Sequence, residues 1–386
     1  MHKKLSLFIG ISCLLLVIGF SSMGWGAKAV PPVMYQFLSK LVSISPYMYN
    51  EDQFNADKND KLIAKNLLEL KKLSQDLKHH ERLMTPGYEI TANYFINNIN
   101  EVYDAFSSKK KHYAFRLFRS TLHACSNCHT QESSTSSMSW NFSDFSLPKD
   151  DFDRANFYYT VRGYDQAWEL FSGVVSSYGK KQKNDSQLND SLGRLLIIAL
   201  RVQRNPAKFR EFLQKLPNRD LMPVYFQNQI QLWISELTNV EKENGYQYLS
   251  KKPSEFDQYI DDLYRAVYPF PKQGRSPKVV MEYASGLMFE FINNRPQDKT
   301  QAMLFWLGVS NLSLDKFESS LMGEKFLQHC IEDYSPTLIS HKCYHALEDQ
   351  WVIGFSGSSG IHLPIDLEKK LKSYRKKLNI DQPWLN

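Results

Sequence analysis

Hydrophobic residues recur at helical spacing in four stretches of the first third of the chain. In the third and fourth stretches the apolar positions alternate steps of four and three residues. They are Tyr88, Ala92, Phe95, Ile99, Val102 and Phe106, then Phe115, Phe118, Leu122, Cys125 and His129. This spacing places the side chains on one face of an α-helix and is typical of helices in a bundle. We therefore predict that residues 30–130 form a four-helix bundle.

The first two stretches complete this bundle. The first begins at Pro31-Pro32, where proline suits a helix start, and ends or kinks at Pro46. The second covers about residues 59–79 and carries apolar residues at similar spacing. We expect the interior of the bundle to be lined by the four apolar faces.

The fourth stretch closes with Cys125-Ser126-Asn127-Cys128-His129. Cys-x-x-Cys-His is the sequence at which a c-type haem is attached. The two thiols bind the haem vinyl groups, and the imidazole becomes the proximal iron ligand. Positions i, i+3 and i+4 share one helix face, so all three side chains can reach one flat ligand. The sequence predicts one covalent haem c between apolar walls that come from residues before residue 131.

The alternative interpretation of Cys125 and Cys128 is a redox-active dithiol. Such dithiols occur near a βαβ pattern, and the chain shows no alternating strand pattern. Haem attachment is therefore the better interpretation.

Four helices with Cys-x-x-Cys-His near the end of the fourth resemble the cytochrome c-prime family and its methionine-ligated relatives. The resemblance covers about residues 31–135 and implies that Cys125 and Cys128 are the thioether positions and that His129 is the proximal ligand. In the methionine-ligated relatives the sixth ligand comes from the first helix, which makes Met34 the first candidate here. The alternatives are Met48, His79, His80, His112 and His123. His123 precedes Cys125 by two residues and should point away from the haem.

Residues 150–386 also read as helices, paired across short polar turns. Segments such as 164–171 and 323–334 resemble second helices of tetratricopeptide repeats, although the period is irregular. We expect an α-solenoid of helical hairpins that binds a protein, with a plain irregular helical domain as the alternative. The serine-rich residues 131–149 read as a linker between the two domains.

The N-terminal residues 1–29 have the order of a secretory signal peptide: a basic start, an apolar run and Ala27-Lys28-Ala29. This predicts export to the periplasm. A retained membrane anchor is the alternative, although the apolar run is short for a membrane span. Removing three lysines and no acid lowers the formal charge from +6 to +3, which gives no reason to propose a nucleic-acid partner.

Cys330 and Cys343 remain after the haem cysteines are assigned. In an oxidising compartment we expect a disulfide between them. A Cys/His metal site is less suitable because the Cys-x-x-Cys pairs of structural zinc sites are absent here. Two buried thiols are the third possibility.

Two other features have plainer interpretations. The glycine-rich segment 354–360 matches no nucleophile or phosphate-binding motif, so we expect a loop. The basic runs at 109–111 and 369–377 read as solvated helix faces, and the first could dock an acidic redox partner.

These observations together predict an all-α, exported monohaem c-type cytochrome that transfers electrons, with its redox partner unidentified. The alternative is a binder or sensor of NO or CO with an open sixth iron position. A third possibility is an adaptor in which the haem is mainly structural. No catalytic constellation is visible in the sequence, so we do not expect an enzyme.

Overall fold

The computed structural model describes residues 32–77, 83, 86–131, 142, 146–180, 183–314, 317–358 and 360–380. The regular structure in these ranges is helical, except for a small antiparallel hairpin of β1 (Ser356–Gly357) and β2 (Gly360–Ile361). The prediction of an all-α fold is therefore confirmed. The proposed signal peptide, His79, His80 and most of the proposed linker lie outside the described residues. None of the described helices has the length and apolar character needed to cross a membrane.

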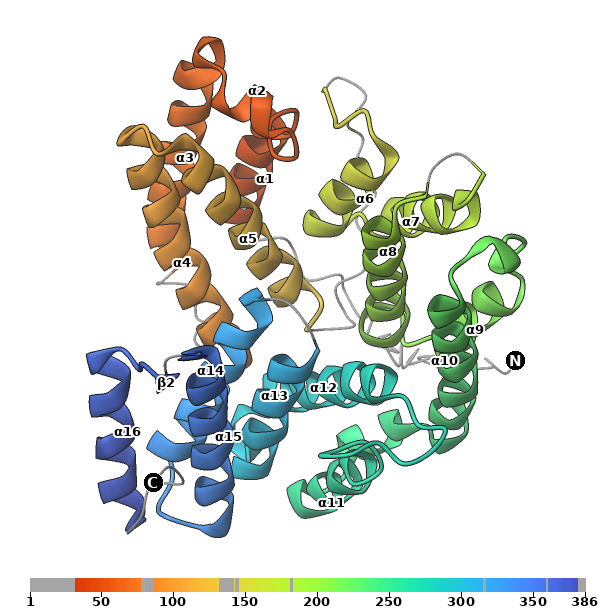
Figure 1. Cartoon of the computed structure of the whole chain (residues 1–386), viewed down its shortest axis with the longest axis vertical. Coiled ribbons are helices and arrows are strands. Elements are labelled where there is room, and N and C mark those ends of the chain that lie inside the picture. Colours follow the sequence, from red (N-terminus) through yellow and green to blue (C-terminus); the bar gives the residue numbers. More distant parts are fainter. Residues whose placement is uncertain are drawn as a thin grey trace, which may run out of the picture.

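The first part of the chain forms a bundle-like group of helices (Figure 1). Its elements are α1 (Pro32–Ile44), α2 (Glu51–Asn55), the 3-10 turn η1 (Asp57–Asn59), α3 (Asp60–Asp76), α4 (Pro86–Ser107) and α5 (Lys111–His129). Helix α3 packs against α1 and α4, and α4 packs against α5. The four long helices begin and end close to the residues that the apolar periodicity predicts.

Helix α2 was not predicted, because five residues are too few to show a period. It begins after Asn50, whose side chain accepts a hydrogen bond from the backbone N–H of Gln53. Its Phe54 is fully buried, and the ring centroids of Phe106 and Phe115 each lie 5.3 Å from its own. The short helix therefore closes one end of the bundle with an aromatic cluster.

The second part consists of helices that pack largely against their neighbours in sequence. They are α6 (Asp151–Thr160), α7 (Tyr164–Ser177), α8 (Asp185–Ile197) with the π-helical turn η4 (Ile198–Val202), α9 (Pro206–Gln214), η5 (Arg219–Leu221), α10 (Val224–Glu243), η6 (Gly245–Ser250), α11 (Pro253–Tyr264), α12 (Pro277–Asn294), η7 (Pro296–Asp298), α13 (Gln301–Ser313), α14 (Phe317–Glu332), α15 (Leu338–Gly354) and α16 (Ile365–Leu378).

Helix α12 is buried on most of its surface. It contacts α8, α10, α11 and α13 within the second part, and α4 of the first part. In a regular solenoid each repeat contacts only its neighbours. Helix α12 instead acts as a central element around which several hairpins pack.

The two parts pack against each other. Helices α12 and α14 lie against α4, and α14 and α6 lie against α5 (Figure 1). At this contact the Gln131 amide donates to the hydroxyl of Thr91 (3.1 Å), and the Met322 sulfur lies 3.6 Å from the same oxygen. The end of the first part is thus held by helices more than 150 residues further along the chain.

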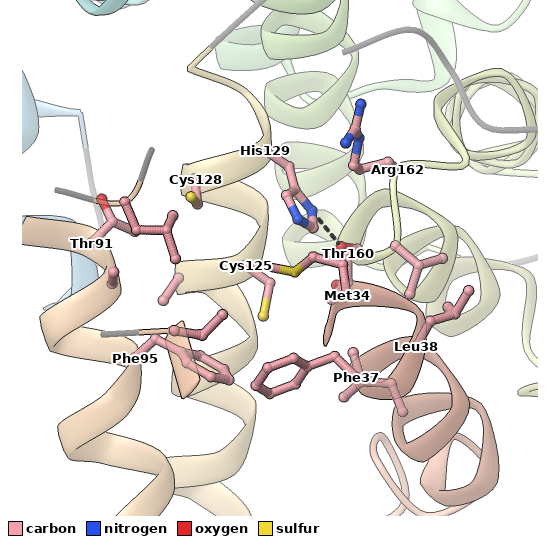
Figure 2. A pocket seen from close by; sticks show the side chains of 16 residues that line it. Met34, Phe37, Leu38, Thr91, Phe95, Cys125, Cys128, His129, Thr160 and Arg162 are labelled. Carbon is pink, nitrogen blue, oxygen red and sulfur yellow. Dashed lines mark hydrogen bonds between the residues drawn. The ribbon is translucent and has the colours of Figure 1, made fainter. Parts of the chain in front are cut away.

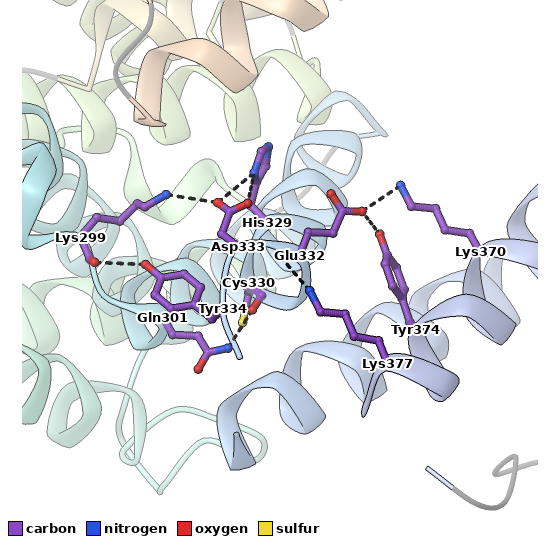
Figure 3. A network of polar contacts seen from close by, with 10 residues as sticks. All are labelled: Lys299, Gln301, His329, Cys330, Glu332, Asp333, Tyr334, Lys370, Tyr374 and Lys377. Atoms are coloured by element: carbon purple, nitrogen blue, oxygen red, sulfur yellow. Dashed lines mark hydrogen bonds and ion pairs between the residues drawn. The ribbon is translucent and has the colours of Figure 1, made fainter. Parts of the chain in front are cut away.

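A disulfide joins Cys330 of α14 to Cys343 of α15, with their Cα atoms 6.3 Å apart. Around it, two acidic residues at the end of α14 and directly after it hold the neighbouring segments (Figure 3). Glu332 accepts a hydrogen bond from Tyr374 and pairs with Lys370 of α16 (3.5 Å). Asp333 pairs with Lys299, which precedes α13 (3.3 Å). Part of the basic run at 369–377 is therefore used inside the molecule.

Candidate haem-binding site

Cys125, Cys128 and His129 line one cavity in the bundle, on the wall formed by α5 (Figure 2). The cavity and its opening together hold about 860 Å³ of empty space. The other walls are mainly apolar. They are formed by Met34, Phe37, Leu38 and Leu41 of α1, Leu77, Leu83, Thr91, Ala92 and Phe95 before and within α4, and Thr160, Val161 and Arg162.

The orientation of His129 is set by a backbone carbonyl. Its Nδ1 lies 3.1 Å from the carbonyl oxygen of Thr160 (Figure 2). A carbonyl oxygen only accepts, so Nδ1 carries the proton and Nε2 keeps its lone pair. Burial, together with the positive charge of Arg162, lowers the pKa of His129 to about 3. The ring is therefore neutral near pH 7, in the form that binds a metal ion.

The Cys125 thiol is held in its protonated form. Burial, and to a smaller extent the neighbouring Cys128, raises its pKa to about 12. Redox-active dithiols depend on a cysteine whose pKa is lowered. The surroundings of Cys125 thus disfavour the dithiol interpretation.

The expectation that all apolar walls come from residues before the linker is wrong. The turn between α6 and α7 supplies Thr160, Val161 and Arg162 to the cavity. This turn is held by backbone hydrogen bonds from Val161 to Phe157 (3.1 Å) and from Gly163 to Tyr158 (2.8 Å). The cavity is therefore built by both parts of the chain.

The contribution of Thr160 could not be found from the sequence. It lies 31 residues beyond His129 and acts through its backbone, so no residue type marks it. The sequence predicts helices and short turns after residue 150, but it does not indicate which turn faces His129.

Of the suggested sixth ligands, Met34 is the one that the described residues place on the cavity wall (Figure 2). Met48 is fully buried elsewhere in the bundle core. His112 is exposed beside Glu51, with 2.8 Å between Nδ1 and the carboxylate. His123 lines a different cavity, as its spacing from Cys125 predicts. His79 and His80 lie outside the described residues.

The donor set fits a haem better than a bare metal ion. Within the described ranges no group of three or more His, Cys, Asp or Glu side chains converges as a metal cluster. Two thiols and one neutral imidazole on a helix face, in front of apolar walls, fit a flat apolar group attached through sulfur.

The basic run at 109–111 is mostly occupied by internal ion pairs. Lys109 pairs with Asp60 (3.0 Å), and Lys111 pairs with Asp57 and Asp60 (2.6 Å each). These ion pairs hold the start of α5 to η1 and α3. Because Lys109 and Lys111 are paired within the molecule, the basic run is less suited to bind an acidic partner than the sequence indicates.

Comparison of the chain with protein-family models, curated proteins and solved structures gives no match. The assignment of the cavity therefore rests on its own residues.

Proposed function

We propose that this protein is a periplasmic monohaem c-type cytochrome that carries electrons, with its haem held in a bundle that resembles the cytochrome c-prime family. In this proposal Cys125 and Cys128 hold the haem through thioether bonds, and His129 is the proximal ligand. The observation that carries the proposal is the hydrogen bond from His129 Nδ1 to the Thr160 carbonyl, in a cavity shared with both cysteines. It puts the ring proton on Nδ1, so Nε2 is the nitrogen that would bind the iron.

Each wall of the cavity has a separate role. Phe37 and Phe95, whose ring centroids lie 5.6 Å apart, exclude water from the space beside Cys125. Thr160 fixes the orientation of the imidazole, and Arg162 places a positive charge near it. The haem, when bound, supplies one-electron chemistry whose potential depends on axial ligation, burial and nearby charge.

Met34 supports electron transfer over the alternative function. A second axial ligand closes the iron to small molecules, and Met34 lies on the wall of the same cavity. If Met34 does not bind, the open position favours a binder or sensor of NO or CO. In either case the second part, whose helical hairpins pack around α12, is proposed to bind a protein partner.

The attachment of haem is tested on a denaturing gel. The wild-type holoprotein should keep its haem stain after unfolding, because thioether bonds survive denaturation. The Cys125→Ser, Cys128→Ser double variant should lose the stain. Haem that leaves the wild type under denaturing conditions would overturn the proposal.

The axial ligand is tested by the optical spectrum of the holoprotein. Met34→Leu keeps the apolar volume and removes the sulfur. If Met34 is the sixth ligand, this variant should change from low spin to high spin and should bind CO. Met48→Leu is the matched control and should keep the wild-type spectrum. A wild type that is already high spin and binds CO would support the alternative function.

A further inference from the structure

A second, polar cavity lies beside α5, and Thr160 lines both this cavity and the candidate haem site. It measures about 310 Å³ with its opening included, and it is enclosed by α5, α6, α8 and the segment after α1. Arg119 and Arg194 line it, together with His123 and Ser126. Neither the haem proposal nor the packing of the helices accounts for two guanidinium groups in this position.

Arg119 and Arg194 differ from most arginines of the described chain because no Asp or Glu carboxylate forms an ion pair with either. The arginines that do have such a partner among the described residues are Arg154, Arg201, Arg204, Arg210, Arg265, Arg275, Arg295 and Arg375. The guanidinium carbon of Arg194 lies 4.7 Å from the ring centroid of Tyr159, and that of Arg119 lies 5.7 Å from the ring centroid of Tyr49. Aromatic rings thus hold both groups without neutralising them.

His123 lines the cavity and holds Arg194 in it. Its Nδ1 lies 2.8 Å from Nη2 of Arg194. A guanidinium group only donates, so Nδ1 accepts this hydrogen bond. The buried hydroxyl of Ser126, one turn further along α5, lines the same cavity.

One acidic residue, Asp153, is close enough to feel the charge of Arg119. Burial and the neighbouring Asp150 raise the pKa of Asp153 to about 6. The guanidinium groups of Arg119 and Arg194 stay protonated at neutral pH, and neither forms an ion pair with Asp153.

We propose that this cavity binds a small oxyanion of the phosphate or sulfate class, held by Arg119 and Arg194. Guanidinium groups match the geometry of such anions through paired N–H donors. His123 orients Arg194, and the hydroxyl of Ser126 lines the same cavity. The proposal does not depend on the haem, because neither arginine lines the candidate haem site.

The proposal is tested by isothermal titration of the full-length holoprotein with inorganic phosphate and with sulfate at constant ionic strength, using chloride as the control anion. We expect saturable binding of phosphate or sulfate and none of chloride. Arg119→Gln should weaken binding about tenfold or more, since it removes charge-assisted hydrogen bonds. Arg119 is exposed, so this variant should fold.

The matched control is Arg116→Gln, which removes the same charge from α5 one turn earlier but does not line the cavity. It should bind phosphate nearly as well as the wild type. Arg194→Gln should abolish binding, and its far-UV circular dichroism reports whether it has folded. The proposal is overturned if phosphate and sulfate bind no better than chloride, or if Arg119→Gln and Arg116→Gln have equal effects.

Discussion

Among single residues, His129 shows most clearly how the fold controls a charge. Its pKa is about 3 in the folded chain, mainly because of burial, whereas an unfolded histidine titrates near 6.5. Between these values the unfolded chain binds a proton that the folded chain does not bind. Acid therefore favours unfolding, and stability falls as the pH decreases from about 6.5 toward 3.

This dependence can be measured without haem in the Cys125→Ser, Cys128→Ser variant. We expect its free energy of unfolding in urea to fall by up to about 1.4 kcal/mol per pH unit below pH 6 because of His129. When His129→Gln is added to this variant, the contribution of His129 should be lost. The free energy of unfolding should then vary with pH only through the other titratable groups. Parallel pH profiles with and without His129 would contradict the prediction.

The disulfide between Cys330 and Cys343 gives a second prediction for individual residues. It closes a loop of sequence separation 13, and both residues are fully buried. The double variant Cys330→Ser, Cys343→Ser should lose about 3 kcal/mol of stability, measured by denaturant unfolding. The wild type treated with reductant should lose a similar amount. No change in either sample would show that the bond does not stabilise the fold.

Among secondary-structure elements, the four long helices of the first part could be predicted because their apolar periods run through many turns. The same periods place Cys125, Cys128 and His129 on one face of α5. These periods cannot indicate which element packs against that face of α5, because an apolar face can pack against any other apolar surface. The packing of α12 against α4, and the turn at 160–162 that closes the cavity, depend on contacts between distant segments and therefore appear only in the folded structure.

The C-terminal end of α4 allows a test of the backbone conformation that ends this helix. Lys109 follows the helix with a φ of 62°, and the next N–H, of Lys110, bonds back to the carbonyl of Ala105 (2.9 Å). This is the left-handed position at which glycine usually ends a helix.

We expect Lys109→Gly to be about 1 kcal/mol more stable than Lys109→Ala. Both variants lose the exposed ion pair with Asp60, so their difference isolates the backbone conformation. Denaturant unfolding of the two variants gives the comparison. Equal stabilities would mean that the backbone at residue 109 is not left-handed.

For the whole molecule, the contact between its two parts predicts what happens when the chain is cleaved between them. Helices α4 and α5 pack against α6, α12 and α14, and the cavity takes one wall from the second part. A specific protease site inserted between Ser136 and Ser137 should yield two fragments that elute together on size exclusion and separate only in denaturant. Fragments that separate in native buffer would show that the parts are independent domains.

The contact between Thr91 and Met322 joins residues 231 positions apart. The entropic cost of closing so long a loop grows only with the logarithm of its length, but folding slows as contacts become more distant in sequence. We therefore expect the two parts to form first and to dock late. The tryptophans of the described chain, Trp168, Trp233, Trp306 and Trp351, all belong to the second part. The part of the fluorescence change that comes from these four tryptophans should thus be complete before the cavity closes.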